Sequence, residues 1–145
     1  NQMNILVIHG PNLNMLGKRN KDHYGQFTLE ELYETISDQY QSVEFSFFQS
    51  NYEGELIDVI QQAETDGYDA ILINPGAFTH QSIAIRDALE ILEIPKVEVH
   101  LSNIDQREPF RKINYIKDVC DATFMGKKIE SYFEAIEFIL NKLVV

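Results

Sequence analysis

Short runs of consecutive apolar residues alternate along the chain with longer segments in which apolar residues recur every three or four positions. The first pattern is typical of strands buried on both faces of a parallel sheet, and the second of amphipathic helices. The runs predict strands over residues 4–9, 43–48, 68–73, 95–99 and, more briefly, 122–125. The spaced patterns predict helices over residues 28–40, 55–65, 80–92 and 129–143, the first opened by a capping box of Thr28 and Glu31.

The alternation of strands and helices predicts an α/β fold in which helices cover both faces of one parallel sheet. Right-handed crossovers leave few arrangements, and we expect a flavodoxin-like three-layer sandwich with five strands in the order 2-1-3-4-5. The chain has no internal repeat, linker or low-complexity stretch, so residues 1–145 are predicted to form a single domain. Residues 1–2, which precede Met3, are interpreted as a short extension or a cloning remnant.

Charge is the most informative part of the composition. The 145 residues include 12 Lys and Arg against 23 Asp and Glu, a formal net charge of −11. This charge repels polyanions, so neither nucleic acid nor an anionic membrane surface is expected as a partner. An anionic ligand would need a local positive potential, which makes the positions of Arg19, Arg107 and Arg111 informative.

The cysteine content and the hydropathy profile bear on location. Cys120 is the single cysteine, so it has no partner for an internal disulfide. No positively charged and then apolar segment opens the chain, and the longest apolar runs are the size of strands. These features predict a reduced, cytoplasmic protein without a transmembrane helix.

Polar side chains of chemical use gather directly after three of the predicted strands. In open doubly wound sheets, ligands bind beyond the carboxyl ends of the strands, where the strand order reverses. Residues 10–25 also form a connection much longer than a strand-to-helix connection usually needs, which favours a functional loop. The three segments contribute Asn12, Arg19 and Tyr24; Asn74, Thr79 and His80; and Glu98, His100, Ser102, Arg107 and Arg111.

Two pairs of these residues suggest acid–base chemistry. Glu98 and His100 share one face of a strand, and a buried carboxylate would orient the imidazole and favour its protonated form. His100 is therefore a candidate general acid, the alternative being an edge strand with a polar face. Tyr24 is a candidate base if Arg19, five residues away, favours the tyrosinate form. The alternative is a tyrosine that packs over the site beside a solvated arginine.

Other polar residues have simpler interpretations. Asn74 or Thr79 can cap the helix that follows, and free amides at that terminus favour hydroxyl or carboxylate oxygens. Arg107 and Arg111 lie one turn apart if their segment is helical, and a solvated basic face is then the default interpretation. His9 ends a buried strand and is interpreted as a hydrogen-bonded core residue.

Several common motifs are missing. The segment from Gly10 to Lys18 has the wrong spacing for a Walker A loop, and Arg19 stands where Ser or Thr is needed. No dinucleotide-binding glycine pattern follows a strand, and neither metal-ligand spacing nor a nucleophile elbow occurs. Asparagines stand where a phospho-receiver module carries acids, so the signalling interpretation is weak.

Four long motifs occur in one register between Met3 and about Arg111. They are residues 5–25, with His9-Gly10-Pro11-Asn12-Leu13-Asn14 at their centre, and residues 48–55, 74–80 and 98–111. Together they resemble the type II 3-dehydroquinate dehydratases. The resemblance implies reversible loss of water from 3-dehydroquinate to give 3-dehydroshikimate, a step of the shikimate pathway of aromatic amino acid biosynthesis. It also implies that neither a metal nor an organic cofactor takes part.

The resemblance assigns roles by position. Tyr24 matches the general base, Arg19 the group that assists its ionisation, and the loop that bears them a lid. Asn12 matches the residue that holds a water near an enolate intermediate. His100 matches the general acid and Glu98 the residue that orients it. Substrate contacts are implied for Asn74, His80, Asp87, Leu101, Ser102, Arg107 and Arg111, with Asp87 reaching the site across a subunit contact.

The resemblance weakens after the fifth strand. Family members usually continue into a glycine-rich turn, but here Gly126 is followed by Lys127-Lys128-Ile129-Glu130, and no catalytic role matches the last helix. The family tends to form dodecamers built from trimers, which implies a homo-oligomer. Two alternatives remain: a flavodoxin-like binding or regulatory module without the activity, and another lyase or isomerase acting on a polyhydroxylated cyclic acid.

Overall fold

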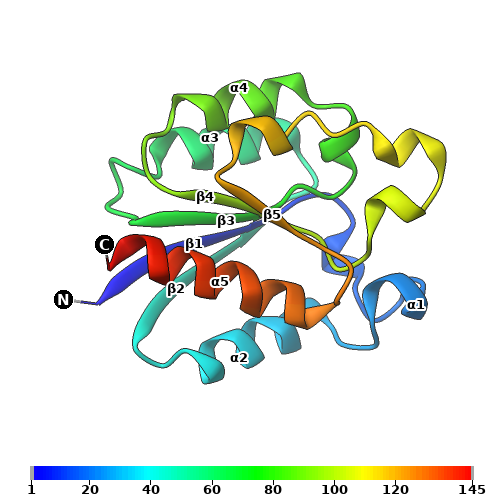
Figure 1. Ribbon diagram of the computed structural model, residues 1–145, viewed down its shortest axis with the longest axis horizontal. Coiled ribbons are helices and arrows are strands. Elements are labelled where there is room, and N and C mark those ends of the chain that lie inside the picture. The colour runs from blue at the N-terminus through cyan, green and yellow to red at the C-terminus, as the bar shows by residue number, and fades with distance from the viewer. Residues whose placement is uncertain (1, 145) are drawn as a thin grey trace.

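The computed structural model describes residues 2–144 and contains a parallel sheet between two layers of helices (Figure 1). Its strands are β1 (Met3–His9), β2 (Val43–Gln49), β3 (Ala70–Asn74), β4 (Lys96–Val99) and β5 (Ala122–Phe124). They lie in the order β2-β1-β3-β4-β5, and all neighbouring pairs are parallel. The predicted fold class and strand order are confirmed. Asn1, half of the two-residue extension, lies outside the described residues.

The helices divide the core into two layers. Helices α2 (Leu29–Gln39) and α5 (Ile129–Leu143) cover one face of the sheet, and α3 (Glu53–Gln62) and α4 (Ile83–Ile91) cover the other (Figure 1). Alternate residues of β1 enter opposite layers, which explains why its apolar run is continuous. The predicted capping box also forms at the start of α2, where the Thr28 hydroxyl and the Glu31 carboxylate each accept the other residue's backbone N–H.

The helix predicted over residues 80–92 is divided in the structure. A 3-10 turn, η2 (Gly76–His80), comes first, and α4 begins only at Ile83. Ser82 has an extended backbone, and its hydroxyl accepts the N–H of Ile85 at 2.9 Å. The prediction that Asn74 or Thr79 caps this helix is therefore wrong, because Ser82 has that role. Thr79 is instead fully buried.

The sequence would place Arg107 and Arg111 on one face if the segment after β4 were a single helix, but the structure has no such helix there. The segment forms two 3-10 turns, η3 (Ile104–Gln106) and η4 (Pro109–Lys112). Pro109 disfavours a helical conformation in the residue before it, and Glu108 is extended accordingly. Three further short elements lie in connections: η1 (Leu13–Met15), α1 (Lys21–Tyr24) and η5 (Lys117–Val119). No helix within residues 2–144 combines the length and apolar character needed to span a membrane.

Candidate active site

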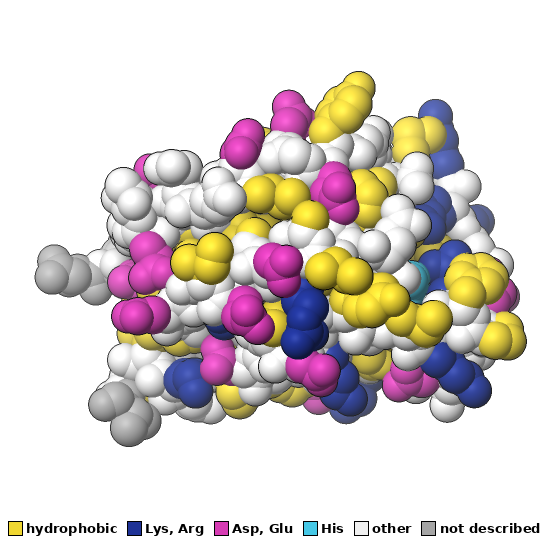
Figure 2. Space-filling view, turned by 90° about the horizontal axis from the view of Figure 1, so that it is seen from above, with side chains coloured by type: hydrophobic (Ala, Val, Ile, Leu, Met, Phe, Trp, Pro, Cys, Tyr) yellow, Lys and Arg dark blue, Asp and Glu magenta, His cyan; other side chains and the backbone are white. Residues whose placement is uncertain are grey.

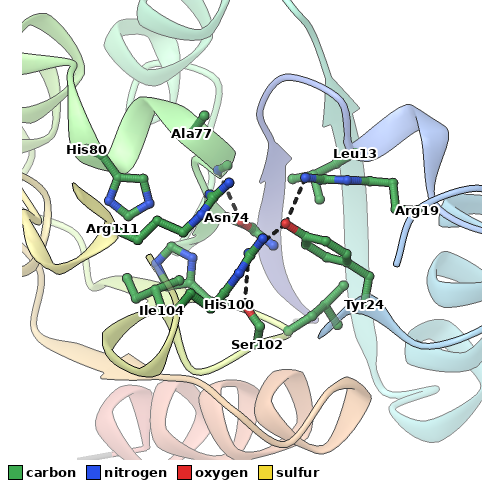
Figure 3. Close-up of a pocket in the computed structure, with 13 residues that line it drawn as sticks. Leu13, Arg19, Tyr24, Asn74, Ala77, His80, His100, Ser102, Ile104 and Arg111 are labelled. Atoms are coloured by element: carbon green, nitrogen blue, oxygen red, sulfur yellow. Dashed lines mark hydrogen bonds between the residues drawn. The ribbon is translucent and has the colours of Figure 1, made fainter. Parts of the chain in front are cut away.

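A pocket opens beyond the carboxyl ends of β1, β3 and β4, where the predicted loops converge (Figure 3). This is the side of the sheet on which the strand order reverses around β1 and β3. The residues that line it are Leu13, Arg19, Tyr24, Asn74, Gly76, Ala77, His80, His100, Leu101, Ser102, Ile104, Arg107 and Arg111. The long first loop, the turn after β3 and the segment after β4 therefore build one site.

The phenol of Tyr24 is held by two arginines. Its oxygen accepts hydrogen bonds from Nη2 of Arg19 and from Nη1 of Arg107, both at 2.7 Å (Figure 3). The Arg19 guanidinium also lies over the Tyr24 ring, 3.8 Å from its centroid. Two cationic donors are therefore aimed at one phenol oxygen, and neither arginine side chain is free in solvent. The alternative of a simply packed tyrosine beside a solvated arginine is therefore wrong.

The contact between Arg107 and Tyr24 was not predicted from the sequence. The Arg107 side chain is only 10% exposed, so the solvated basic face expected by default is wrong for this residue. It lies 83 residues from Tyr24, beyond the reach of any local spacing rule. Its Nη1 also donates to the Ser102 hydroxyl at 3.3 Å, which ties the phenol to the turn after β4. Among residues 2–144, its buried Nε has no hydrogen-bond partner.

Local backbone geometry fixes both ends of the first loop. At the start, Gly10 lies so close to the chain after β3 that a Cβ would stand 2.2 Å from the Pro75 carbonyl oxygen. At the other end, the Asn20 side chain caps α1 by accepting the Asp22 N–H at 2.8 Å. Helix α1 in turn carries Tyr24, which is 8% exposed. The loop is therefore anchored against β3 before it reaches the phenol.

The opposite side of the pocket is built on β4. Glu98 is fully buried, and its Oε2 lies 2.5 Å from Nε2 of His100. The same carboxylate accepts the Thr123 hydroxyl at 2.8 Å and the Asn114 amide at 2.9 Å. Strand β4 lies between β3 and β5, so the alternative of a polar edge strand is wrong. Asn114 and Thr123 were missed because neither has a recognisable spacing from Glu98.

These contacts set the charge state of Glu98. Burial alone would raise the pKa of its carboxyl group, but the hydrogen bond and charge of His100, together with Thr123 and Asn114, outweigh burial. The pKa of Glu98 therefore lies below its ordinary value, and the carboxylate is ionised at neutral pH. The ionised carboxylate at Nε2 fixes the orientation of the His100 ring.

The remaining lining groups supply donors and acceptors for an oxygen-rich ligand. His80 donates Nδ1–H to the Ile113 carbonyl at 2.7 Å, which leaves Nε2 as an acceptor. Desolvation lowers the pKa of His80, so this ring is neutral at neutral pH. Arg111 is held by Glu108 at 2.8 Å, and Leu101 and Ser102 form the buried turn that follows β4.

Three residues in the predicted set lie outside this lining. One is Glu98, which is fully buried and bonded to His100, and the others are Asn12 and Asp87. Asn12 is exposed and has a left-handed backbone with φ 67°, held by a hydrogen bond from its N–H to Asn51 at 3.0 Å. Its neighbour Leu13 lines the pocket instead. Asp87 is exposed on α4. Within residues 2–144, no group of three or more His, Cys, Asp or Glu side chains is arranged to hold a metal ion.

One pocket of a doubly wound sheet therefore holds a phenol between two guanidinium groups and an imidazole on a buried carboxylate. Residues 3–140 match the family described as dehydroquinase class II, and the chain belongs to this family. The resemblance found in the sequence is thereby confirmed.

Known relatives match the chain along almost its full length. Proteins named 3-dehydroquinate dehydratase from Thermotoga petrophila and Polynucleobacter asymbioticus are 51% identical over 143 residues and 52% identical over 141 residues. The matches cover 97% of both chains in the first case, and 96% of this chain and 95% of the relative in the second. The crystal structure of a type II dehydroquinase from Butyrivibrio crossotus matches with a TM-score of 0.92 and 47% identity, covering 95% of this chain and 97% of that one.

Proposed function

We propose that this protein is a 3-dehydroquinate dehydratase, which removes water from 3-dehydroquinate to give 3-dehydroshikimate in the shikimate pathway. The observation that carries the proposal is the pairing within one pocket of a phenol oxygen bound by two arginines with an imidazole bound by a buried carboxylate. Loss of water beside a ketone needs both a base for the C–H proton and an acid for the departing hydroxyl. The family membership and the names of the relatives support the same reaction.

The proposed steps balance with groups of the chain alone. Tyr24, as phenolate, takes the proton from the carbon beside the ketone, and an enolate forms. Protonated His100 then gives its proton to the hydroxyl as the C–O bond breaks, so water leaves and the conjugated product remains. Solvent removes the proton from Tyr24 and restores the proton of His100. Every step is reversible, and none requires a metal or an organic cofactor.

Recognition of the substrate follows from the charge and polarity of the lining. Arg19, Arg107 and Arg111 place three cations in a chain of net charge −11, which concentrates positive potential where an anion binds. In the proposal, the turn of Leu101 and Ser102 binds the substrate carboxylate. Asn74, His80, Arg107 and Arg111 contact its oxygen atoms.

The first loop has two parts in this proposal. Asn12 holds the water that faces the enolate, and the left-handed backbone secured by Asn51 fixes its position. The segment that carries Arg19 and Tyr24 acts as a lid, closing over the ring so that the base meets the substrate only in the closed site. Closure also brings Tyr24 to Arg107, which is not on the loop.

We further propose that the protein assembles into trimers and then dodecamers, with Asp87 completing the site of a neighbouring copy. Asp87 lies on α4 between Ile83 and Ile91, which are four residues away on either side and 56% and 72% exposed. Figure 2 views the molecule from above Figure 1, on the side of α4, and shows apolar side chains among acidic ones on that face. Such a helix face is suited to a subunit contact. Sedimentation should give the mass of twelve chains, and a monomer would refute the assembly.

We also propose that the protein is located in the cytoplasm. Its single cysteine, which has no partner for an internal disulfide, supports this location.

A direct assay tests the function. Purified protein is mixed with 3-dehydroquinate, and the ultraviolet absorbance of the conjugated product is followed. Absorbance should rise at a rate proportional to protein concentration, and borohydride added with the substrate should not inactivate the protein, because no lysine forms a Schiff base. No product at high protein concentration would refute the proposed function.

A further inference from the structure

A chain of buried polar groups lies beneath the pocket, on the side of the sheet covered by α2 and α5. His9 and Asn74 are direct neighbours in the pairing of β1 with β3, and both are at most 4% exposed. Tyr132, from the first turns of α5, is fully buried between them. Its hydroxyl lies 2.9 Å from Nδ2 of Asn74 and 2.8 Å from Nε2 of His9. The proposed catalytic steps use neither Tyr132 nor His9.

The direction of every hydrogen bond in this chain can be deduced. The Gly76 N–H can only donate, and it donates to Oδ1 of Asn74 at 3.1 Å, so Nδ2 is the atom that faces Tyr132. The Tyr132 oxygen must accept from that amide, so its own proton goes to Nε2 of His9. His9 is neutral, because burial lowers its pKa to about 3, and its proton must therefore be on Nδ1. Nδ1 faces the Tyr33 hydroxyl at 3.3 Å.

The consequence concerns the remaining N–H of Asn74. With Oδ1 on Gly76 and one amide proton on Tyr132, the amide cannot turn over without breaking both bonds. Asn74 also lines the pocket (Figure 3). Its Nδ2 has a second proton, which can be donated there. We infer that Tyr132 and His9 are positioning residues that hold Asn74 as a hydrogen-bond donor toward a substrate hydroxyl. The inference rests on the proposed function for the identity of the ligand, and it gives α5 a part in the site.

Kinetics of Tyr132→Phe test the inference. This variant keeps the ring but removes the acceptor of the Asn74 amide. We expect KM to rise about threefold to tenfold, the effect of one neutral hydrogen bond, while kcat changes less than twofold. Tyr40→Phe is the matched control, because the Tyr40 hydroxyl also bonds to α5, at the Phe133 carbonyl, but lies outside the chain of polar groups. Its KM and kcat should equal those of the wild type.

A double-mutant cycle separates positioning from general damage to the fold. If Tyr132 acts through Asn74, then Tyr132→Phe should raise KM no further in an Asn74→Ala background. An equal rise in both backgrounds, or no rise in the single variant, would overturn the inference. If Tyr132→Phe does not fold, as judged by thermal unfolding, His9→Phe replaces it. That variant removes the acceptor of the Tyr132 proton and should raise KM in the same direction, and an unchanged KM would overturn the inference.

A measurement without substrate keeps the inference distinct from the proposed function. The Asn74 side-chain amide signals are assigned in the NMR spectrum by their loss in Asn74→Ala. The proton that bonds to Tyr132 should exchange slowly with solvent in the wild type and fast in Tyr132→Phe. Equal exchange in the two proteins would overturn the positioning role. A wild type that lacks dehydratase activity but shows the expected exchange would refute the proposed function alone.

Discussion

Tyr24 and His100 line the same pocket, but the first is carried by a long loop and the second directly follows β4, which lies between two other strands. The Tyr24 oxygen is held by two arginine side chains, one from its own loop and one from the segment after β4. His100 is held by a carboxylate that is itself fixed by Thr123 and Asn114 and fully buried in the sheet. The proposed base therefore depends on loop closure, whereas the proposed acid is already in place in the folded sheet.

The comparison teaches which substitutions separate chemistry from folding. If the loop acts as the proposed lid, a change on the loop side removes contacts of the closed site alone, so it should affect turnover and leave stability intact. A change around Glu98 disturbs a buried charge with all its partners inside the core, so it should affect turnover and stability together.

The largest effect is expected for Tyr24→Phe. Removing the phenol oxygen removes the proposed base, so kcat should fall by about 10²–10⁴-fold while the melting temperature stays within about 2 °C of the wild type. The absorbance assay and thermal unfolding measure the two quantities. Tyr52→Phe, which alters an exposed tyrosine outside the pocket, is the matched control. Retained activity in the Tyr24 variant would exclude it as the base.

Glu98→Gln should lower both kcat and the free energy of unfolding. The neutral amide no longer stabilises protonated His100, so kcat should fall about 10²-fold, and one of the buried partners is left unsatisfied at a cost of about 1–3 kcal/mol in unfolding free energy. Glu93→Gln, on the surface, is the control. A Glu98 variant that loses activity at unchanged stability would contradict the proposed difference between the two sides.

The stability effect of Glu98→Gln should also depend on pH. The pKa of Glu98 is lower in the folded chain than its ordinary value of 4.5, so the folded state favours the ionised form. The resulting stabilisation is fully present above that ordinary value and is lost as pH falls through the folded pKa. Denaturant unfolding should therefore show a larger gap between wild type and variant at pH 7 than at pH 3. A gap that is constant with pH would contradict the assignment of an ionised carboxylate.

A smaller effect should distinguish the two arginines of the loop side. Lysine keeps the charge but not the guanidinium geometry, so Arg19→Lys and Arg107→Lys should each lower kcat by about tenfold. Because Arg107 also bonds to Ser102, its substitution should in addition raise KM, and that of Arg19 should not. Steady-state kinetics of the two variants make the comparison. Identical KM values would show that Arg107 does not link the base to the turn after β4.

The sequence predicted the sheet and the two chemical pairs because both depend on local signals. Continuous apolar runs mark buried strands, and a two-residue spacing puts Glu98 and His100 on one face whatever the rest of the chain does. The break before α4 was missed because the helical spacing of apolar residues does not show that Ser82 is the N-cap. The contact of Arg107 with Tyr24 could not be predicted, since it joins a loop to a turn that are adjacent only after the sheet has formed.

The most direct test of the central claim, that Tyr24 and His100 act on the substrate from different sides of one pocket, is the stereochemistry of the reaction. Figure 3 shows the two side chains approaching the pocket from different directions. With deuterium at one of the two positions on the carbon beside the ketone, mass spectrometry of the product shows which hydrogen is lost. A trans elimination is predicted, in which the hydrogen opposite the departing hydroxyl is removed. Loss of the hydrogen on the same side as that hydroxyl would contradict the account.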